Sequence, residues 1–239
     1  MSKKKNIQNI LIVAWKLIRY NLKIIFANKF LYFFLAAVMF FILVTLINLF
    51  SGSNPTEGSV YYLLFVPGFL LVFYPTTYGI QNDLDSRMLE IIFGIPNYRY
   101  KVWLLRLIQI YIIVSINLLF LCFLSSLAIV RIPVFEMVYQ LMFPIFMIGS
   151  LSFMFSTVIK SGNGAGVVVI IILTFLFILA DPLQESKFNI YLNPFEIPRE
   201  VNETIWKMTS FYNRLILIII SILANLIGLY NLQKREKFV

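Results

Sequence analysis

The side chains that could do chemistry are few, and they exclude most kinds of enzyme. The chain of 239 residues has no histidine, which removes the commonest general base and metal ligand. Its one cysteine, Cys122, lies within an apolar run, where a thiol acts as a small hydrophobic side chain. Hydrolysis within a membrane needs a nucleophile paired with a base, or a set of metal ligands. We therefore expect no catalytic residue, no metal site and no cofactor bound by this chain.

Charged residues gather instead in the stretch 81–101, QNDLDSRMLEIIFGIPNYRYK. The acidic residues at its start suit the N-terminus of a helix, and Gly94 and Pro96 would end that helix. The stretch predicts a short amphipathic helix, for which ordinary loop packing against lipid head groups is the alternative. The apolar side of the helix would consist of Leu84, Met88, Ile91 and Ile92.

A second polar stretch, 181–214, is too long for a tight turn and too short for a domain. Within it Asn193-Pro194-Phe195 would stop one short helix and start another, with Glu196 following directly. We expect two short helices that dip into the membrane interface, a re-entrant pair; a solvated acidic loop is the alternative. The acidic residues of this stretch are Asp181, Glu185, Glu196, Glu200 and Glu203.

The glycine-rich run 161–166, SGNGAG, is a poor candidate for phosphate binding. It lacks the Lys-Ser/Thr of a P-loop and leads into an apolar run instead of following a strand. We interpret its small residues as a place where helices approach each other closely.

Composition places these stretches in a membrane protein. Hydrophobic residues make up 60% of the chain and charged residues only 13%. A soluble protein of this size could not cover its surface with so few charges. About 20 apolar residues span a bilayer as a helix. Six runs without a charged residue meet this need: Phe30–Thr56, Gly58–Asn82, Leu107–Val130, Met137–Ile159, Ser161–Ala180 and Leu215–Gln233.

The distribution of basic residues predicts the orientation. If the N-terminus is cytoplasmic, most of the 20 lysines and arginines fall on the cytoplasmic side, as the positive-inside rule requires. Both termini are then cytoplasmic, and 81–101 is cytoplasmic while 181–214 is outside. The net charge of +9 is explained by contact with anionic lipids, and we expect no nucleic-acid partner.

Residues 1–29 precede the first apolar run and carry basic side chains on one face of a helical wheel. They predict an amphipathic helix lying in the cytoplasmic interface, for which a frayed basic tail is the alternative. Residues 30–239 would form a single transmembrane domain. The predicted fold is thus an all-α membrane protein with six transmembrane helices, an interfacial helix, a cytoplasmic helix and an outer re-entrant pair.

This layout resembles the membrane subunit of type-2 ATP-binding cassette (ABC) exporters over essentially the full length. The family's loop after span two typically reads acidic-x-acidic-x-Gly-Thr-Leu-Glu, with a proline six residues later. The matching residues here are Asp83, Asp85, Leu89, Glu90 and Pro96, with Arg87 and Met88 in place of Gly-Thr. The run 192–195, LNPF, resembles the family's Asn-Pro after span five.

The resemblance implies a permease that pairs with a second copy or a close relative, and with two cytoplasmic ATPase subunits that bind ATP and Mg²⁺. The short helix in 81–101 would couple ATP hydrolysis to the spans, and the setting would be a bacterial inner membrane. The coupling residues would be Asp83, Asp85, Arg87, Met88, Glu90, Ile91, Ile92 and Pro96. Aromatic residues of span two could line the path of a bulky amphipathic or lipid-linked substrate, or else face lipid: Phe65, Phe69, Phe73 and Tyr74.

Two other functions stay open at this point. A secondary carrier needs ionisable groups near the bilayer midplane, and the apolar runs contain none; Glu136, Asp181 and Arg214 lie at predicted ends, as interfacial anchors would. A non-transporting ABC membrane subunit, which passes ATP hydrolysis to another machine, would have the same sequence features as an exporter.

Overall fold

The computed structural model describes residues 23, 25–26, 29–50, 54–159, 161–199 and 201–233. Among these residues there are helices and turns but no strand. The all-α prediction is therefore confirmed for the described part of the chain. The interfacial helix predicted for residues 1–29 lies almost wholly outside the described residues.

Seven α-helices and one π-helical turn follow one another along the described chain. They are α2 (Phe30–Phe50), α3 (Glu57–Asp85), α4 (Met88–Phe93), η1 (Arg99–Leu104), α5 (Leu105–Ala128), α6 (Val134–Ile159), α7 (Gly162–Ile178) and α8 (Glu203–Asn231). Five of the helical segments are long and apolar enough to cross a membrane: α2, α3, η1 with α5, α6, and α8. The sixth predicted run forms α7, which is apolar but has only 17 residues, or about 25 Å of helix.

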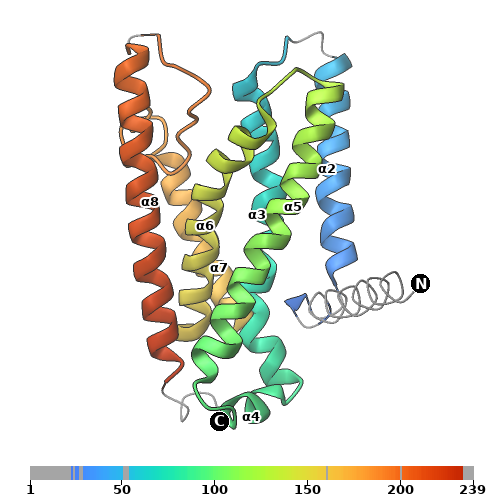
Figure 1. Cartoon of the computed structure of the whole chain (residues 1–239), viewed down its shortest axis with the longest axis vertical. Helices are drawn as coiled ribbons and strands as arrows, with labels where there is room; N and C mark the ends of the chain where they lie inside the picture. The colour runs from blue at the N-terminus through green and yellow to red at the C-terminus, as the bar shows by residue number, and fades with distance from the viewer. Residues whose placement is uncertain are drawn as a thin grey trace, which may run out of the picture.

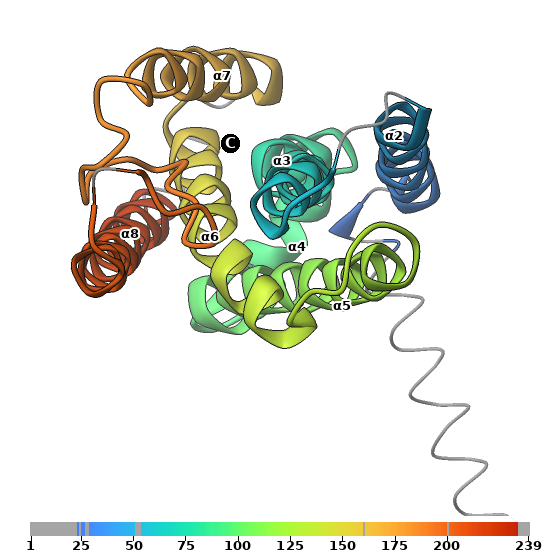
Figure 2. The same cartoon turned by 90° about the horizontal axis from the view of Figure 1, so that it is seen from above.

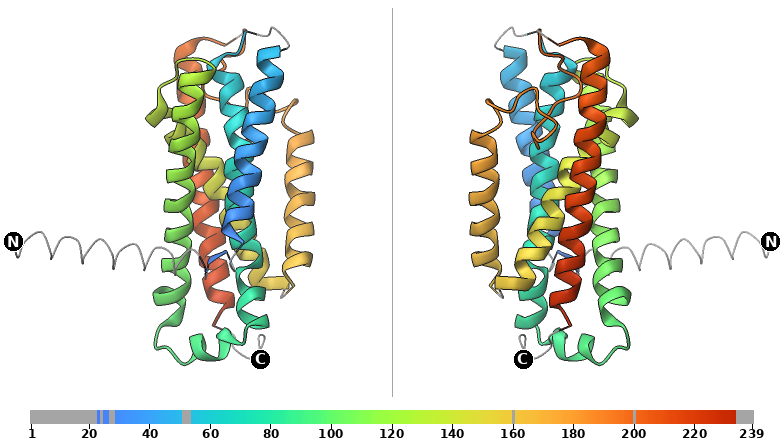
Figure 3. Two further views of the ribbon diagram at one scale, coloured as in Figure 1. Left: turned by 90° about the vertical axis from the view of Figure 1, so that its right-hand side faces the viewer. Right: turned by 90° about the vertical axis from the view of Figure 1, so that its left-hand side faces the viewer.

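Helix α3 occupies the middle of the bundle and contacts α2, α5, α6 and α7 (Figures 1 and 2). Helix α8 packs mainly on α6, and α7 stands at one side of the bundle against α3 and α6 (Figure 3). The short helix α4 lies at one end of the bundle, and the connection between α7 and α8 lies toward the other end (Figure 1). The two polar stretches of the sequence are therefore separated by the length of the apolar helices.

Small residues allow α3 and α6 to approach each other closely. A Cβ atom added to Gly68 on α3 would lie 2.3 Å from Ile145 Cδ1 on α6. One added to Gly149 on α6 would lie 2.7 Å from Val72 Cγ2 on α3. Close backbone approach of this kind is typical of helix packing in membranes, where dispersion contacts replace the hydrophobic effect as the driving force.

Helix α8 begins at Glu203, twelve residues before the apolar run that predicted it. Asn202 caps the helix, since its side chain accepts a hydrogen bond from Thr204 N. An ion pair between Glu203 and Lys207, 2.7 Å long, lies on the exposed face of the first turn. A search for runs without charges begins such a helix too late, because it discards the charged residues of its first turns.

The prediction of a re-entrant helical pair in 181–214 is wrong. The described residues between α7 and α8 form consecutive turns, and the remainder of the stretch belongs to α8. Side-chain amides pair with backbone N–H groups that would otherwise pair with carbonyls in a helix. Asn189 Oδ1 accepts from Tyr191 N, and Asn193 Oδ1 accepts from Phe195 N. Asn213 on α8 donates to two backbone carbonyls of the connection, those of Lys187 and Asn189.

Candidate functional site

The first candidate site is α4 at one end of the bundle, with the residues just before it. Asp85, Arg87, Glu90 and Ile91 are all exposed there, and Ile91 presents 66% of its surface. Met88 and Pro96 are also exposed. The structure thus presents two carboxylates, one guanidinium and two apolar side chains on α4 and the residues just before it.

Two predicted contact residues, Ile92 and Asp83, do not belong to this exposed surface. Ile92 is 5% exposed and packs inward beside Leu89. The sequence predicted that Ile92 lies on the same side of the helix as Ile91. Consecutive residues of a helix point about 100° apart, so α4 can bury Ile92 against the bundle while Ile91 stays exposed. The buried cluster that receives them draws on every neighbouring element: Ile80, Tyr98, Trp103, Leu107, Phe153, Leu229 and Leu232.

This cluster ties α4 to the apolar helices. Its members come from α3, η1, α5, α6 and α8, and the Tyr98 hydroxyl also donates a hydrogen bond to the Leu232 carbonyl after α8. Because Leu89 and Ile92 are buried in this cluster, a shift of α4 would displace side chains on several of the spans.

Asp83 also faces inward, which corrects the prediction that it contacts a partner. It is 4% exposed and accepts hydrogen bonds from Arg106 Nη1 at 2.6 Å and Nη2 at 3.3 Å. The Arg106 guanidinium also lies over the Trp103 ring, 4.7 Å from its centroid. The pair joins the end of α3 to the start of α5, on either side of α4. Sequence reasoning missed Arg106 because it lies 23 residues from Asp83.

Arg87 adopts a left-handed backbone conformation with a φ of 55°, directly before α4. For a residue with a Cβ this conformation costs about 1 to 2 kcal/mol, and glycine avoids that cost. The side chain is exposed. The turn from α3 into α4 is therefore one that a glycine would fit better.

The variant Arg87→Gly is expected to raise the free energy of unfolding by about 0.5 to 1 kcal/mol, after allowing for the greater freedom of glycine in the unfolded chain. Thermal unfolding in detergent, followed by circular dichroism, would measure the change. Asn97→Gly is the matched control. Asn97 has a φ of 58°, but asparagine tolerates that conformation, so the free energy of unfolding should rise by only about a few tenths of a kcal/mol. A loss of stability in Arg87→Gly would contradict the expectation.

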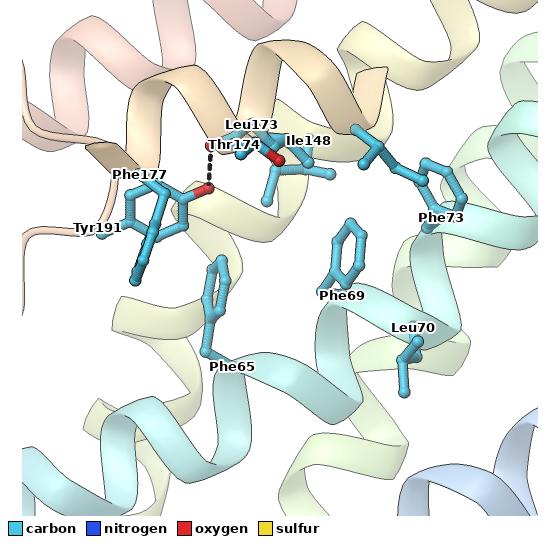
Figure 4. Close-up of a pocket in the computed structure, with 10 residues that line it drawn as sticks. Phe65, Phe69, Leu70, Phe73, Ile148, Leu173, Thr174, Phe177 and Tyr191 are labelled. Atoms are coloured by element: carbon cyan, nitrogen blue, oxygen red, sulfur yellow. Dashed lines mark hydrogen bonds between the residues drawn. The ribbon is translucent and has the colours of Figure 1, made fainter. Parts of the chain in front are cut away.

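The second candidate site is a cavity of about 460 Å³ between α3 and α7, closed at one side by Ile148 of α6 (Figure 4). Phe65, Phe69 and Phe73 line it from α3, as their spacing of four residues allows. From α7 and the connection that follows, the lining residues are Ile170, Leu173, Thr174, Phe177 and Tyr191. The lining is almost wholly apolar, which suits a bulky apolar group.

Tyr74, predicted to belong to the same path, faces the other way. Its ring stacks on Phe33 of α2 with the centroids 4.3 Å apart, and on Tyr78 at 5.2 Å. Lys29 Nζ lies 5.6 Å from the centroid of the Tyr74 ring. A step of one residue from Phe73 turns a side chain by about 100° around a helix, which carries Tyr74 to the α2 side.

Tyr191 is a lining residue that the sequence did not single out. Its ring makes edge contacts with Phe65 and Phe177, each at 5.6 Å between centroids, and its hydroxyl donates to the Leu173 carbonyl at 3.0 Å (Figure 4). Burial raises the pKa of Tyr191 to about 12, so the hydroxyl keeps its proton and remains a donor. The connection after α7 thus closes one end of the cavity.

The predicted residues Asn193 to Glu196 anchor this connection to the start of α3. Asn193 Nδ2 donates to the Gly58 carbonyl at 3.0 Å and lies 3.4 Å from Glu196 Oε2. Phe195 packs near Tyr61, with ring centroids 6.0 Å apart, and Pro194 lines a separate cavity beside α6 and α8. These residues position the end of the cavity that lies away from α4 and do not line it.

The glycine-rich run opens α7 against α3. Ser161 caps α7 by accepting a hydrogen bond from Gly164 N, and Gly162 N donates to Gln81 Oε1 at 2.6 Å. A Cβ on Gly162 would lie 2.5 Å from Tyr78 Cδ1. The interpretation of this run as a close approach of helices is confirmed.

Helix length and hydropathy together define the class: the chain is a multi-pass α-helical membrane protein. No protein-family model, no curated protein and no solved structure matches it. Its function is therefore argued from the two sites.

Proposed function

We propose that this chain is the membrane subunit of a type-2 ABC exporter. Two copies, or one copy and a close relative, would bind two cytoplasmic ATPase subunits, which bind ATP and Mg²⁺. The chain would lie in a bacterial inner membrane with both termini in the cytoplasm, and α7 would also span the membrane, which brings the number of spans to six. A 17-residue helix crosses a membrane when its ends lie in the interface or when it packs against longer helices, as α7 does against α3 and α6.

The geometry of α4 carries this proposal. One face of α4 is exposed and bears charged and apolar side chains, while its other face is packed into a cluster shared with most of the spans. A force applied to the exposed face would therefore be transmitted to the spans, which is what coupling to an ATPase requires. Arg87 adds support, because it occupies the glycine position of the family's motif and has the backbone conformation that favours glycine.

The cavity between α3 and α7 is the proposed substrate path. Its apolar lining favours a bulky amphipathic or lipid-linked substrate over a small polar one. The turns between α7 and α8, in place of a helical pair, are where the chain departs from the family's layout.

The coupling surface can be tested by co-purification. The chain, purified in mild detergent from its native host, should carry a soluble ATPase in stoichiometric amount, identified by mass spectrometry. The triple variant Asp85→Ala, Glu90→Ala, Ile91→Ser should lose that ATPase, because it removes exposed contacts and leaves the buried cluster intact. The control is the double variant Asp181→Ala, Glu185→Ala. It removes two exposed carboxylates from the connection after α7, at the end of the bundle away from α4, and should keep the ATPase.

Recovery of the chain alone, or retention of the ATPase by the triple variant, would contradict the proposed coupling surface. A chain recovered alone that moves solutes down a proton or Na⁺ gradient would be a secondary carrier instead.

A further inference from the structure

A second polar feature of the bundle lies away from both candidate sites. It is a cavity of about 350 Å³ between the outer ends of α6 and α8, beside the connection that precedes α8. Its buried polar lining comes from one face of α8, where Trp206, Ser210 and Arg214 are spaced four residues apart. Neither the coupling surface nor the cavity between α3 and α7 uses these residues.

Arg214 is a buried cation with neutral partners. It is 5% exposed and lies about 16 Å along α8, so the prediction that it is an interfacial anchor is wrong. Its guanidinium donates to four neutral oxygens: Gln140 Oε1, Asn213 Oδ1, the Tyr61 hydroxyl and the Leu192 carbonyl. Among the described residues no carboxylate lies within 4 Å of it. A buried charge balanced only by dipoles favours an anion.

Two further residues that line the same cavity carry side-chain donors without an acceptor. Trp206 Nε1 and Ser210 Oγ are both buried, and neither has a hydrogen-bond partner among the described residues. Buried donors are seldom left unpaired, since each costs about 1 to 3 kcal/mol. Two neutral donors and one guanidinium on a single face suit the several oxygens of a phosphate group.

The cavity continues into an apolar groove of about 620 Å³ between α5, α6 and α8. Tyr139, Phe143 and Ile218 line both spaces, so they mark the junction. The rest of the groove is lined largely by aliphatic side chains of α5, such as Ile112 and Ile116. A polar cavity joined to an apolar groove has the shape and chemistry of an amphiphile with a phosphate head and an acyl chain.

The rim of the cavity selects the head group. Glu136 is exposed at the start of α6 and lines the rim. Lys207 also lines it, but that ammonium is paired with Glu203 at 2.7 Å. With Glu203 counted beside it, the rim carries two carboxylates and one ammonium, which favours an ammonium beyond the phosphate and disfavours a second anion.

We propose that this cavity and groove bind one membrane phospholipid with an ethanolamine head group. Its phosphate would accept hydrogen bonds from Arg214, Ser210 and Trp206, its ammonium would lie beside Glu136, and one acyl chain would occupy the groove. This proposal requires only that the chain lies in a membrane. Its test therefore does not depend on whether the chain is a transporter.

Native mass spectrometry of the purified full chain tests the site. The chain is delipidated with excess detergent and then offered equal amounts of phosphatidylethanolamine and phosphatidylglycerol. One phosphatidylethanolamine should remain bound per chain, in about fivefold preference over phosphatidylglycerol. Glu136→Gln should abolish that preference, and Glu185→Gln, which removes an exposed carboxylate outside the cavity, should retain it.

A second pair of variants tests the groove without disturbing the buried charge. Ile218→Trp fills the junction and should lose the bound lipid, while Ile222→Trp, one turn further along α8 and lining neither space, should keep it. Both should unfold at the temperature of the parent chain. Retention of lipid by Ile218→Trp, no stoichiometric lipid in the parent chain, or equal binding of the two lipids would each overturn the proposal.

Discussion

Replacing Asp83 by asparagine is expected to lower the free energy of unfolding by about 3 to 5 kcal/mol. The carboxylate is buried and accepts two hydrogen bonds from Arg106, so its loss leaves a guanidinium without a counter-charge at the junction of α3 and α5. Unfolding in mixed micelles, followed by circular dichroism across a denaturant series, would measure the loss. It is the largest stability effect we expect from a single substitution in this chain.

The double variant Asp83→Leu with Arg106→Met separates the charge from the packing. Replacing both partners of a buried ion pair by apolar residues of similar volume is often close to neutral. The double variant should therefore recover most of the stability lost by Asp83→Asn. Asp85→Asn is the control: that carboxylate is exposed two residues away, and its loss should change stability by less than about 0.5 kcal/mol. Equal stability of Asp83→Asn and Asp85→Asn would contradict the buried pair.

Elements with a strong local pattern could be predicted from the sequence. Runs without charges correspond to α2, α3, α5, α6 and α7 to within a few residues at most ends, because a lipid-facing helix has to be apolar along its length. The spacing of Phe65, Phe69 and Phe73 predicts that all three lie on one face of the helix, and in the structure all three line the same cavity. Helix α4 also lies within the stretch predicted to hold a short helix.

Features that depend on distant partners could not be predicted. Whether Asp83 faces a partner or the bundle is decided by Arg106, which lies on another helix. A search for runs without charges placed Arg214 at the end of a span. In the structure Arg214 is buried and donates to four acceptors from α3, α6, α8 and the connection before α8, which the sequence does not show to be close. The connection after α7 contains residues that could have formed short helices, but the side chain of Asn213 on α8 holds it in turns.

Filling the cavity between α3 and α7 is expected to reduce transport at least about tenfold without unfolding the chain. Thr174 lines the cavity from α7 and is exposed, so Thr174→Trp places an indole in the space without disturbing the buried core. Phe175→Trp is the matched control, since residue 175 is also exposed on α7 but does not line the cavity. The indole would occupy space that the substrate needs, and a loss of about 1.4 kcal/mol in its binding free energy corresponds to a tenfold change.

ATP-driven uptake of the amphipathic dye rhodamine 6G into inverted membrane vesicles would measure this effect, with the partner ATPase present. Thr174→Trp should reduce uptake about tenfold or more and Phe175→Trp should leave it unchanged, while both variants retain the ATPase on purification. Equal uptake by the two variants would mean that the path lies elsewhere. If the parent chain binds the ATPase but moves no solute in an ATP-dependent manner, the chain is a non-transporting ABC subunit. The cavity would then hold a resident lipid or a partner helix, since its apolar lining has to be covered by an apolar group in either case.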